Sequence, residues 1–117
     1  MVLIAGLALS GCAPTRPPDT GLGDAAQALA DAREAGAPTY APLELRSAQD
    51  HLNQAREQAG KRHHEESRRL TDESRADSEL AELKARLGKL REQVQGATAD
   101  NERLRQQSAG AGGEASP

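Results

Sequence analysis

The sequence has almost no aromatic residues. Its 117 residues include no Trp, no Phe and a single tyrosine, Tyr40. Because aromatic side chains normally supply much of the area that a globular core buries, a deep core is excluded. The remaining apolar residues are mostly Ala and Leu, which favour helices. The sequence therefore predicts an all-α protein held together by thin helix–helix seams.

An excess of one charge is lacking as well, and so are the common catalytic motifs. The chain carries 15 Lys and Arg and 18 Asp and Glu residues, interspersed, which leaves no basic patch for nucleic acid. Patterns of the GxSxG, HExxH, CxxC and P-loop kinds do not occur. Thin amphipathic helices also offer no enclosed pocket in which the pKa of a catalytic side chain could be shifted. We expect no enzyme activity and no nucleic-acid partner.

The densest group of potential metal ligands is the run HHEE at 63–66. Neighbouring helical residues point about 100° apart, so His63 and His64 cannot bind one ion from the same face. His64 also shares its face with Arg68, which would repel a cation. A solvated turn and no metal site are therefore expected here. His51 stands alone among polar neighbours and is expected to be exposed.

The chain has one cysteine, Cys12, and so cannot form an internal disulfide. It closes the segment MVLIAGLALSGC, whose apolar run from Val2 to Leu9 is too short to cross a bilayer, which takes about 20 apolar residues. An apolar run of this length followed by small residues is typical of a signal peptide. No Lys or Arg precedes it, which indicates either an upstream start codon or an unusually short signal. The alternative interpretation is a chance cysteine in an apolar N-terminus.

The four residues Leu9-Ser10-Gly11-Cys12 resemble the lipobox of bacterial lipoproteins. The resemblance implies cleavage between Gly11 and Cys12, with residues 1–11 removed as a signal peptide. It also implies that Cys12 carries a diacylglyceryl group and an N-acyl chain, and no other cofactor is expected. Ala13 is not the aspartate of inner-membrane retention, which favours export to the outer membrane. We expect a lipoprotein of the cell envelope, in the inner leaflet of the outer membrane facing the periplasm if the organism is Gram-negative.

The rest of the chain is predicted to form a short helix followed by an antiparallel helical hairpin with a long, coiled-coil-like last helix. Asp24 can cap the first helix, and Gly36 is placed to end it. Pro42 suits the first position of the second helix, with Tyr40 and Leu45 as a hydrophobic staple across its start. The expected segments are a Pro- and Gly-rich linker at 12–23, helices at 24–35, 42–60 and 64–107, and a disordered tail at 108–117.

The second half of the long helix carries a heptad pattern. Its apolar residues alternate at spacings of three and four, which is typical of a coiled coil. An Asn at one a position can fix the register and the two-stranded state. The a positions are Leu80, Leu87, Val94 and Asn101, and the d positions are Leu83, Leu90, Ala97 and Leu104.

Three arrangements would bury this stripe: a homodimer through residues 80–104, packing against the first two helices, or the helix of another protein. Gly88 and Gly96 weaken each of them, since glycine costs a helix about 1 kcal/mol. In a parallel dimer the flanking charge pairs would be Glu79–Lys84 and Asp100–Arg105, which attract, and Arg86–Arg91, which repel.

The segment ALADAREAGAPTYAPLELRSAQDHLNQAREQA, at 28–59, resembles a domain of unknown function found in small helical bacterial lipoproteins. The resemblance extends over 25–81, and AGAPTYAPLEL at 35–45 is its most specific part. The same domain occurs ahead of OmpA-like peptidoglycan-binding domains, which implies OmpA-like or cell-wall proteins as partners. The last helix has only a weak apolar stripe in its first half, at Ser67, Leu70, Ser74, Asp77 and Ala81. Serines stand at 67, 74 and 78 where the family usually has alanines, which predicts looser three-helix packing.

These features together predict a non-catalytic helical spacer or adaptor, held on the bilayer through Cys12. A peptidoglycan-associated envelope-integrity protein is one alternative, suggested by the domains that accompany this one in the family. A periplasmic holdase-type chaperone is another, since exposed Ala and Leu seams could bind unfolded proteins.

Overall fold

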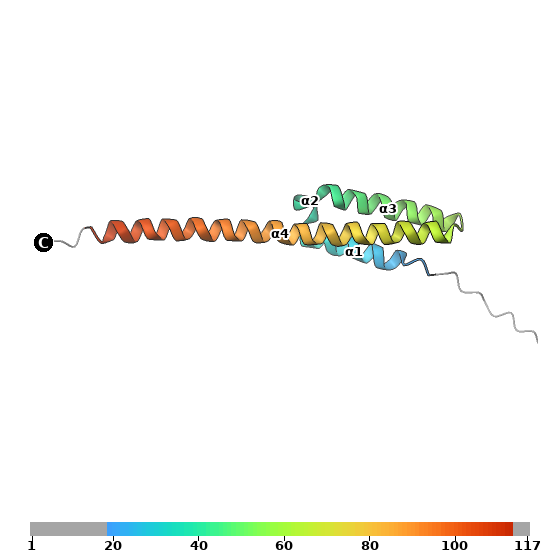
Figure 1. The fold of residues 1–117 in the computed structure, drawn as a ribbon, viewed down its shortest axis with the longest axis horizontal. Helices are drawn as coiled ribbons and strands as arrows, with labels where there is room; N and C mark the ends of the chain where they lie inside the picture. Colours follow the sequence, from blue (N-terminus) through green and yellow to red (C-terminus); the bar gives the residue numbers. More distant parts are fainter. Residues whose placement is uncertain (1–18, 114–117) are drawn as a thin grey trace, which may run out of the picture.

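The computed structural model of the protein describes residues 19–113, and this part of the chain is helical throughout, with no strand (Figure 1). The predicted all-α fold with a long C-terminal helix is confirmed. The helices are α1 (Leu22–Ala35), α2 (Ala37–Tyr40), α3 (Pro42–Gly60) and α4 (His64–Ala111). At 1.5 Å per residue, α4 is about 72 Å long.

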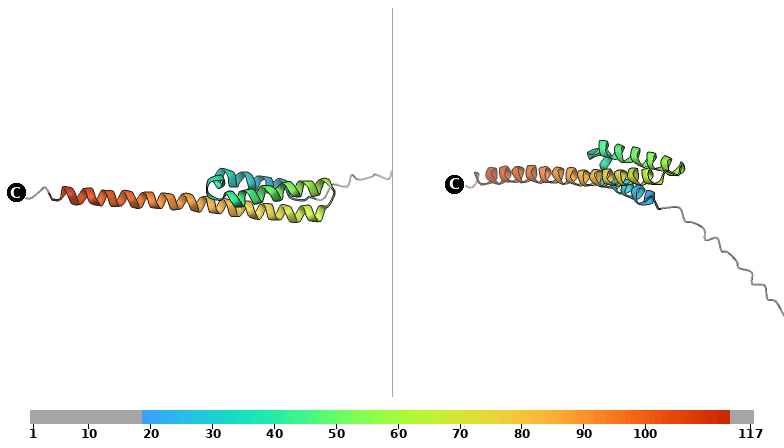
Figure 2. Two further views of the ribbon diagram at one scale, coloured as in Figure 1. Left: turned by 90° about the horizontal axis from the view of Figure 1, so that it is seen from above. Right: turned by 45° about the vertical axis from the view of Figure 1, so that its right-hand side comes forward.

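The helices α1 and α3 lie side by side against the first half of α4 (Figures 1 and 2). Contacts at both ends of α1 show that it runs parallel to α4, since Gly21 lies beside Thr71 and Gly36 beside Lys89. The helix α3 runs in the opposite direction, as an antiparallel hairpin partner of α4. The result is a three-helix bundle from which the second half of α4 protrudes.

The start of α1 differs from the prediction. The helix begins at Leu22, so the last two residues of the expected linker are helical, and Asp24 lies within the first turn instead of capping it. Gly21 precedes the helix with a left-handed φ of 71°, and its N–H donates a hydrogen bond to Asp19, 2.9 Å away. The left-handed conformation suits a residue without Cβ, which is why the helix starts directly after this glycine.

Gly36 ends the helix α1, as predicted, but the turn that follows contains a short helix that was not predicted. Gly36 has a φ of 102°, and its N–H bonds back to the last carbonyls of α1. The one-turn helix α2 then fits between Gly36 and Pro42, where α3 begins as expected. Pro38 is tolerated there because the first residues of a helix need no N–H partner.

The far end of α4 also corrects the prediction. The helix continues to Ala111, four residues beyond the expected end at Gln107, so part of the expected disordered tail is helical. Ser108 assists this extension, since its hydroxyl donates to the carbonyl of Leu104 at 2.9 Å. The glycines at 110, 112 and 113 then end the helix, because glycine is a poor helix former.

The face of α4 that points into the bundle is made of small residues. Ser67, Ser74 and Ser78 are fully buried, and two of their hydroxyls cross to α3. Ser67 donates to the carbonyl of Ala55 at 2.9 Å and Ser74 to that of Ala48 at 2.7 Å. We call this surface the inner face of α4; its buried small residues are Ser67, Thr71, Ser74, Ser78, Ala81 and Ala85.

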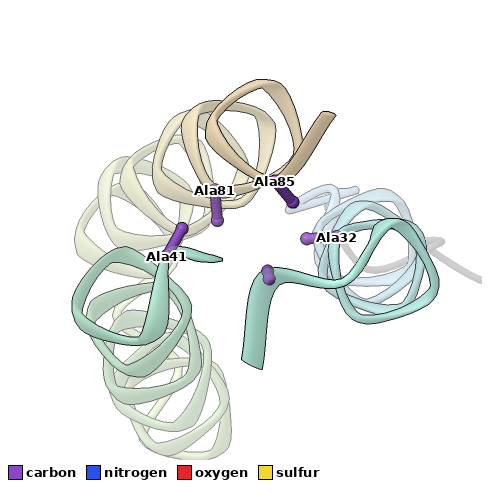
Figure 3. Packing of buried hydrophobic residues seen from close by; sticks show 5 residues of the cluster. Ala32, Ala41, Ala81 and Ala85 are labelled. Carbon is purple, nitrogen blue, oxygen red and sulfur yellow. The ribbon is translucent and has the colours of Figure 1, made fainter. Parts of the chain in front are cut away.

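The buried serines therefore allow α3 and α4 to pack closely, and the prediction of looser packing is wrong. A buried hydroxyl costs free energy only when it lacks a hydrogen-bond partner, and these hydroxyls have partners. Of the expected stripe, Asp77 is only half-buried while Leu70 is buried. Toward the other end of the bundle, alanines of α1, α2 and α4 meet the alanine that joins α2 to α3 (Figure 3). They are Ala32, Ala37, Ala41, Ala81 and Ala85.

The inner face gives a first prediction. Ser74→Ala is expected to lower the free energy of unfolding by about 1 kcal/mol, the usual contribution of one hydrogen bond. Ser74→Leu is expected to lower it by at least about 2 kcal/mol, because the backbones of α3 and α4 leave no room for the larger side chain. Urea denaturation followed by circular dichroism measures both. Ser108→Ala, which removes an exposed hydroxyl, is the control, and a neutral Ser74→Leu would contradict the close approach.

Candidate functional site

The predicted heptad stripe lies on the surface. Its large side chains keep about half of their area in solvent, from 45% for Leu80 and Leu87 to 65% for Leu83. Ala97 and Asn101 are exposed as well. The alternative in which this stripe packs against the first two helices is therefore wrong for the described chain. We call the stripe the leucine face of α4: Leu80, Leu83, Leu87, Leu90, Val94, Ala97, Asn101 and Leu104.

The leucine face and the inner face lie on opposite sides of one helix. At about 100° per residue, their centres are about 180° apart. Both follow spacings of three and four, but only the inner face contacts α1 and α3. Small side chains let helices approach closely, which the leucines would prevent. In the described residues nothing covers the leucine face.

Charged side chains flank the leucine face, and several already have partners within the chain. Lys84 pairs with Glu44 of α3, and Arg86 with Glu82. The hydrogen bond from Lys84 lowers the pKa of the Glu44 carboxyl below its usual value. Such exposed pairs contribute little stability, so they leave the flanking charges available to a partner.

The bundle ends where Tyr40 rests on α4. A Cβ atom at Gly88 would overlap with Cδ1 of Tyr40, so the ring occupies the place of a side chain there. The hydroxyl of Tyr40 donates to Oε2 of Glu92 at 2.7 Å, which raises the pKa of the tyrosine. Gly88, which lowers helix propensity, is thus required for this contact. Beyond it, every residue from 93 to 113 is exposed.

His51 corrects a further prediction. Its side chain is half-buried between α3 and α4, with Nδ1 2.9 Å from Oδ2 of Asp77 and Nε2 3.5 Å from Oε2 of Glu73. The hydroxyl of Ser47 donates to Asp77 at 2.7 Å. The hydroxyl of Ser47 does not bond to the imidazole of His51. These side chains therefore lack the Ser–His hydrogen bond that activates a serine nucleophile. The group links α3 to α4, and no pattern in the sequence indicated that His51 and Asp77, 26 positions apart, lie together.

The residues of the run 63–66 lie where α3 turns into α4. Nδ1 of His63 contacts Oε1 of Gln58 at 2.8 Å, and Arg69 pairs with Glu66, which lowers the pKa of that carboxyl. Within residues 19–113, no three His, Cys, Asp or Glu side chains are arranged to hold a metal ion. Over the same range, no helix is both long and apolar enough to cross a membrane.

The predicted cleavage and lipidation residues, Gly11 and Cys12, lie outside the described residues. The described chain begins at Asp19, which with Thr20 lines a shallow groove beside His64 and Arg68. The start of the described chain therefore lies at the α3–α4 turn, at the end of the bundle opposite to Tyr40. The protruding part of α4 leads away from that end (Figures 1 and 2).

The contact of Tyr40 with α4 predicts opposite outcomes for two glycines of the same helix. Gly88→Ala is expected to lower the free energy of unfolding by about 1–3 kcal/mol, because its methyl group displaces the ring. Gly96→Ala is the matched control, since nothing lies within 4 Å of its Cβ position. It is expected to raise helicity, as alanine favours a helix by about 1 kcal/mol over glycine. A Gly88→Ala variant as stable as the parent would contradict the contact.

The hydrogen bond to Glu92 predicts how the only tyrosine titrates. The raised pKa means that the bond stabilises the fold below pH of about 10, and that this contribution disappears as the pH rises through the raised value. Glu92→Ala is expected to return the pKa of Tyr40 toward about 10. Ultraviolet absorbance of tyrosinate measures it without interference, because the chain has no other Tyr and no Trp. Glu102→Ala, farther along α4, is expected to leave the pKa unchanged.

Comparison with known proteins places this fold in a family. No curated protein and no solved structure matches the sequence. Residues 20–97 match a domain of unknown function, DUF4398, over a range that covers the whole bundle and the first part of the protruding helix. Since the match takes in more than half of the chain, the protein belongs to the DUF4398 family.

Proposed function

We propose that the protein is a lipid-anchored, non-catalytic helical spacer or adaptor of the cell envelope. The observation that carries the proposal is the placement of the two ends of the described chain. Asp19 lies at the α3–α4 turn, and Ala111 lies at the far end of α4 (Figure 1). A chain anchored just before Asp19 would therefore hold one end of the bundle near the bilayer and direct the other end away from it.

The reach of the intervening chain supports this orientation. Six residues lie between Cys12 and Asp19, which makes seven steps along the chain. A fully extended chain spans at most about 3.6 Å per step, or about 25 Å here. The helix α4 then carries its last residues about 72 Å beyond the anchored end of the bundle. The protein would thus place the leucine face and the tip of α4 at a fixed distance from the lipid surface.

The packing of the bundle supports a role without catalysis. Its interior is filled by alanines, by the buried leucines Leu29, Leu52 and Leu70, and by hydroxyls that donate to main-chain carbonyls. This packing leaves no space for a substrate among the described helices. Two shallow concave surfaces of the described chain are lined mainly by charged side chains, some of which pair with one another, as Arg69 does with Glu66 and Arg86 with Glu82. Such a surface suits contact with other macromolecules better than the enclosure of a small molecule.

The anchor gives a direct test. Mass spectrometry of protein extracted from membranes is expected to show a chain that begins at Cys12 and carries acyl chains on that residue. Cys12→Ser is expected to remove the acyl mass, and with it the contribution of about 0.8 kcal/mol per buried methylene to membrane binding. A chain found unmodified, or one that keeps the acyl mass after Cys12→Ser, would contradict the anchor.

A matched control moves the thiol instead of removing it. Cys12→Ser combined with Ser108→Cys keeps one cysteine in the chain at an exposed position of α4. This variant is expected to carry no acyl chain, which would show that the position of the cysteine matters and not its presence. Retention of the protein on isolated sacculi would favour peptidoglycan association, and suppression of aggregation of an unfolded protein would favour a holdase.

A further inference from the structure

The leucine face of α4 needs a partner for a physical reason. Beyond Glu92 the helix makes no contact with the rest of the described chain, and it contains Gly96, Thr98 and Asn101, all weak helix formers. Helices in proteins owe most of their stability to packing of an apolar face, and these weak helix formers leave the unpacked part of α4 with little stability of its own. The apolar face that could supply this packing is the leucine face, about 36 Å long from Leu80 to Leu104.

We propose that a second copy of this chain covers the leucine face, in a parallel, in-register, two-stranded coiled coil. The proposal goes beyond the envelope anchor and does not depend on it, because it rests on described residues alone. The pattern continues for about four heptads with charged flanking positions, the length at which a coiled coil is expected. Each apolar layer is self-complementary, since Leu80, Leu83, Leu87 and Leu90 can each face their own copy.

Asn101 favours the parallel, in-register arrangement. In that arrangement it faces Asn101 of the other copy, and two amides can hydrogen bond to each other. In the antiparallel register that pairs all the apolar layers, Asn101 would face Leu83, and its amide would lose its partner. A buried amide without a partner costs free energy, so the antiparallel form is disfavoured.

The flanking charges favour the same orientation. One edge of the leucine face carries only basic charges, at Lys84, Arg91 and Arg105. An antiparallel pair would bring these basic edges together, since e positions then face e positions. A parallel pair instead places them beside the other edge of the second copy, where Glu79 faces Lys84 and Asp100 faces Arg105. Arg86 opposite Arg91 is the one repulsive pair, against two attractive ones.

The bundle does not obstruct this dimer. Since α1 and α3 pack on the inner face, on the opposite side of α4, two copies can meet along their leucine faces with the two bundles outside. In the parallel dimer both α3–α4 turns lie at one end and both protruding tips at the other. Two chains anchored before Asp19 would then contribute their anchors on the same side.

The oligomeric state is tested on the full chain carrying Cys12→Ser, which has neither lipid nor cysteine. Light scattering at micromolar concentration is expected to give the mass of a dimer. Leu87→Glu is expected to raise the dissociation constant at least about thirtyfold, because it buries a charge in a central layer. Leu43→Glu is the matched control, since Leu43 is also exposed, at 78%, but lies on α3 outside the leucine face. It is expected to leave the dimer intact.

The orientation is tested with cysteines placed in the same cysteine-free chain. Leu104→Cys is expected to form a disulfide between copies under mild oxidation, because residue 104 faces itself in a parallel dimer. In the antiparallel register the two copies of residue 104 would lie about 36 Å apart and could not be bridged. Glu102→Cys lies near the same end of α4 on the opposite side of the helix and is expected not to cross-link.

Each outcome decides between named arrangements. A monomeric mass would overturn the proposal and leave the helix of a different protein as the occupant of the leucine face. A dimer that survives Leu87→Glu would place the contact elsewhere, for example in the apolar residues before Cys12, and would overturn it too. A dimer lost on Leu87→Glu but without the Leu104→Cys disulfide would overturn the parallel orientation. Acylation at Cys12 is measured separately, so failure here does not bear on the anchor.

Discussion

The hydroxyls of Ser67 and Ser74 reach from α4 to main-chain carbonyls of α3, and this contact requires the two backbones to lie close together. Only small side chains fit between backbones at such a separation, and fully buried alanines occupy the facing positions of α3. The bundle therefore gains its stability from many close contacts of small groups and from hydroxyls that retain their hydrogen bonds. No large apolar core is needed.

The same constraint determines where the leucines lie. Because the buried side of α4 consists of serine, threonine and alanine, with Leu70 as its one large apolar residue, the leucines of its second half lie on the opposite side. The helix thus has one face that holds the fold together and another that is free to hold a partner. Tyr40 lies where these roles separate: its ring covers Gly88 and its hydroxyl reaches Glu92, after which α4 leaves the bundle.

Much of the local structure could be predicted from the residues. Gly36 ends α1, Pro42 begins α3, and the spacing of the leucines identified a continuous apolar stripe on α4. Apart from the start of α1 at Leu22 and the end of α4 at Ala111, the predictions that failed concern contacts between distant residues. His51 bridges to Asp77 and Glu73, and Ser74 bonds to Ala48, across 22 to 26 positions of the sequence. Periodicity carries no information about such pairs, because it describes one helix at a time.

By itself, then, the sequence determined the three longer helices, where two of the turns fall and which residues share a face. The tertiary structure alone decided which face of α4 points inward. Two stripes on that helix share the same spacing of three and four, so periodicity cannot choose between them, and hydropathy favours the wrong one. The choice depends on side-chain size, because helices joined by short turns pack most closely through alanine and serine. On α4, close packing buried the serines of the inner face and left the leucines of the leucine face exposed to solvent.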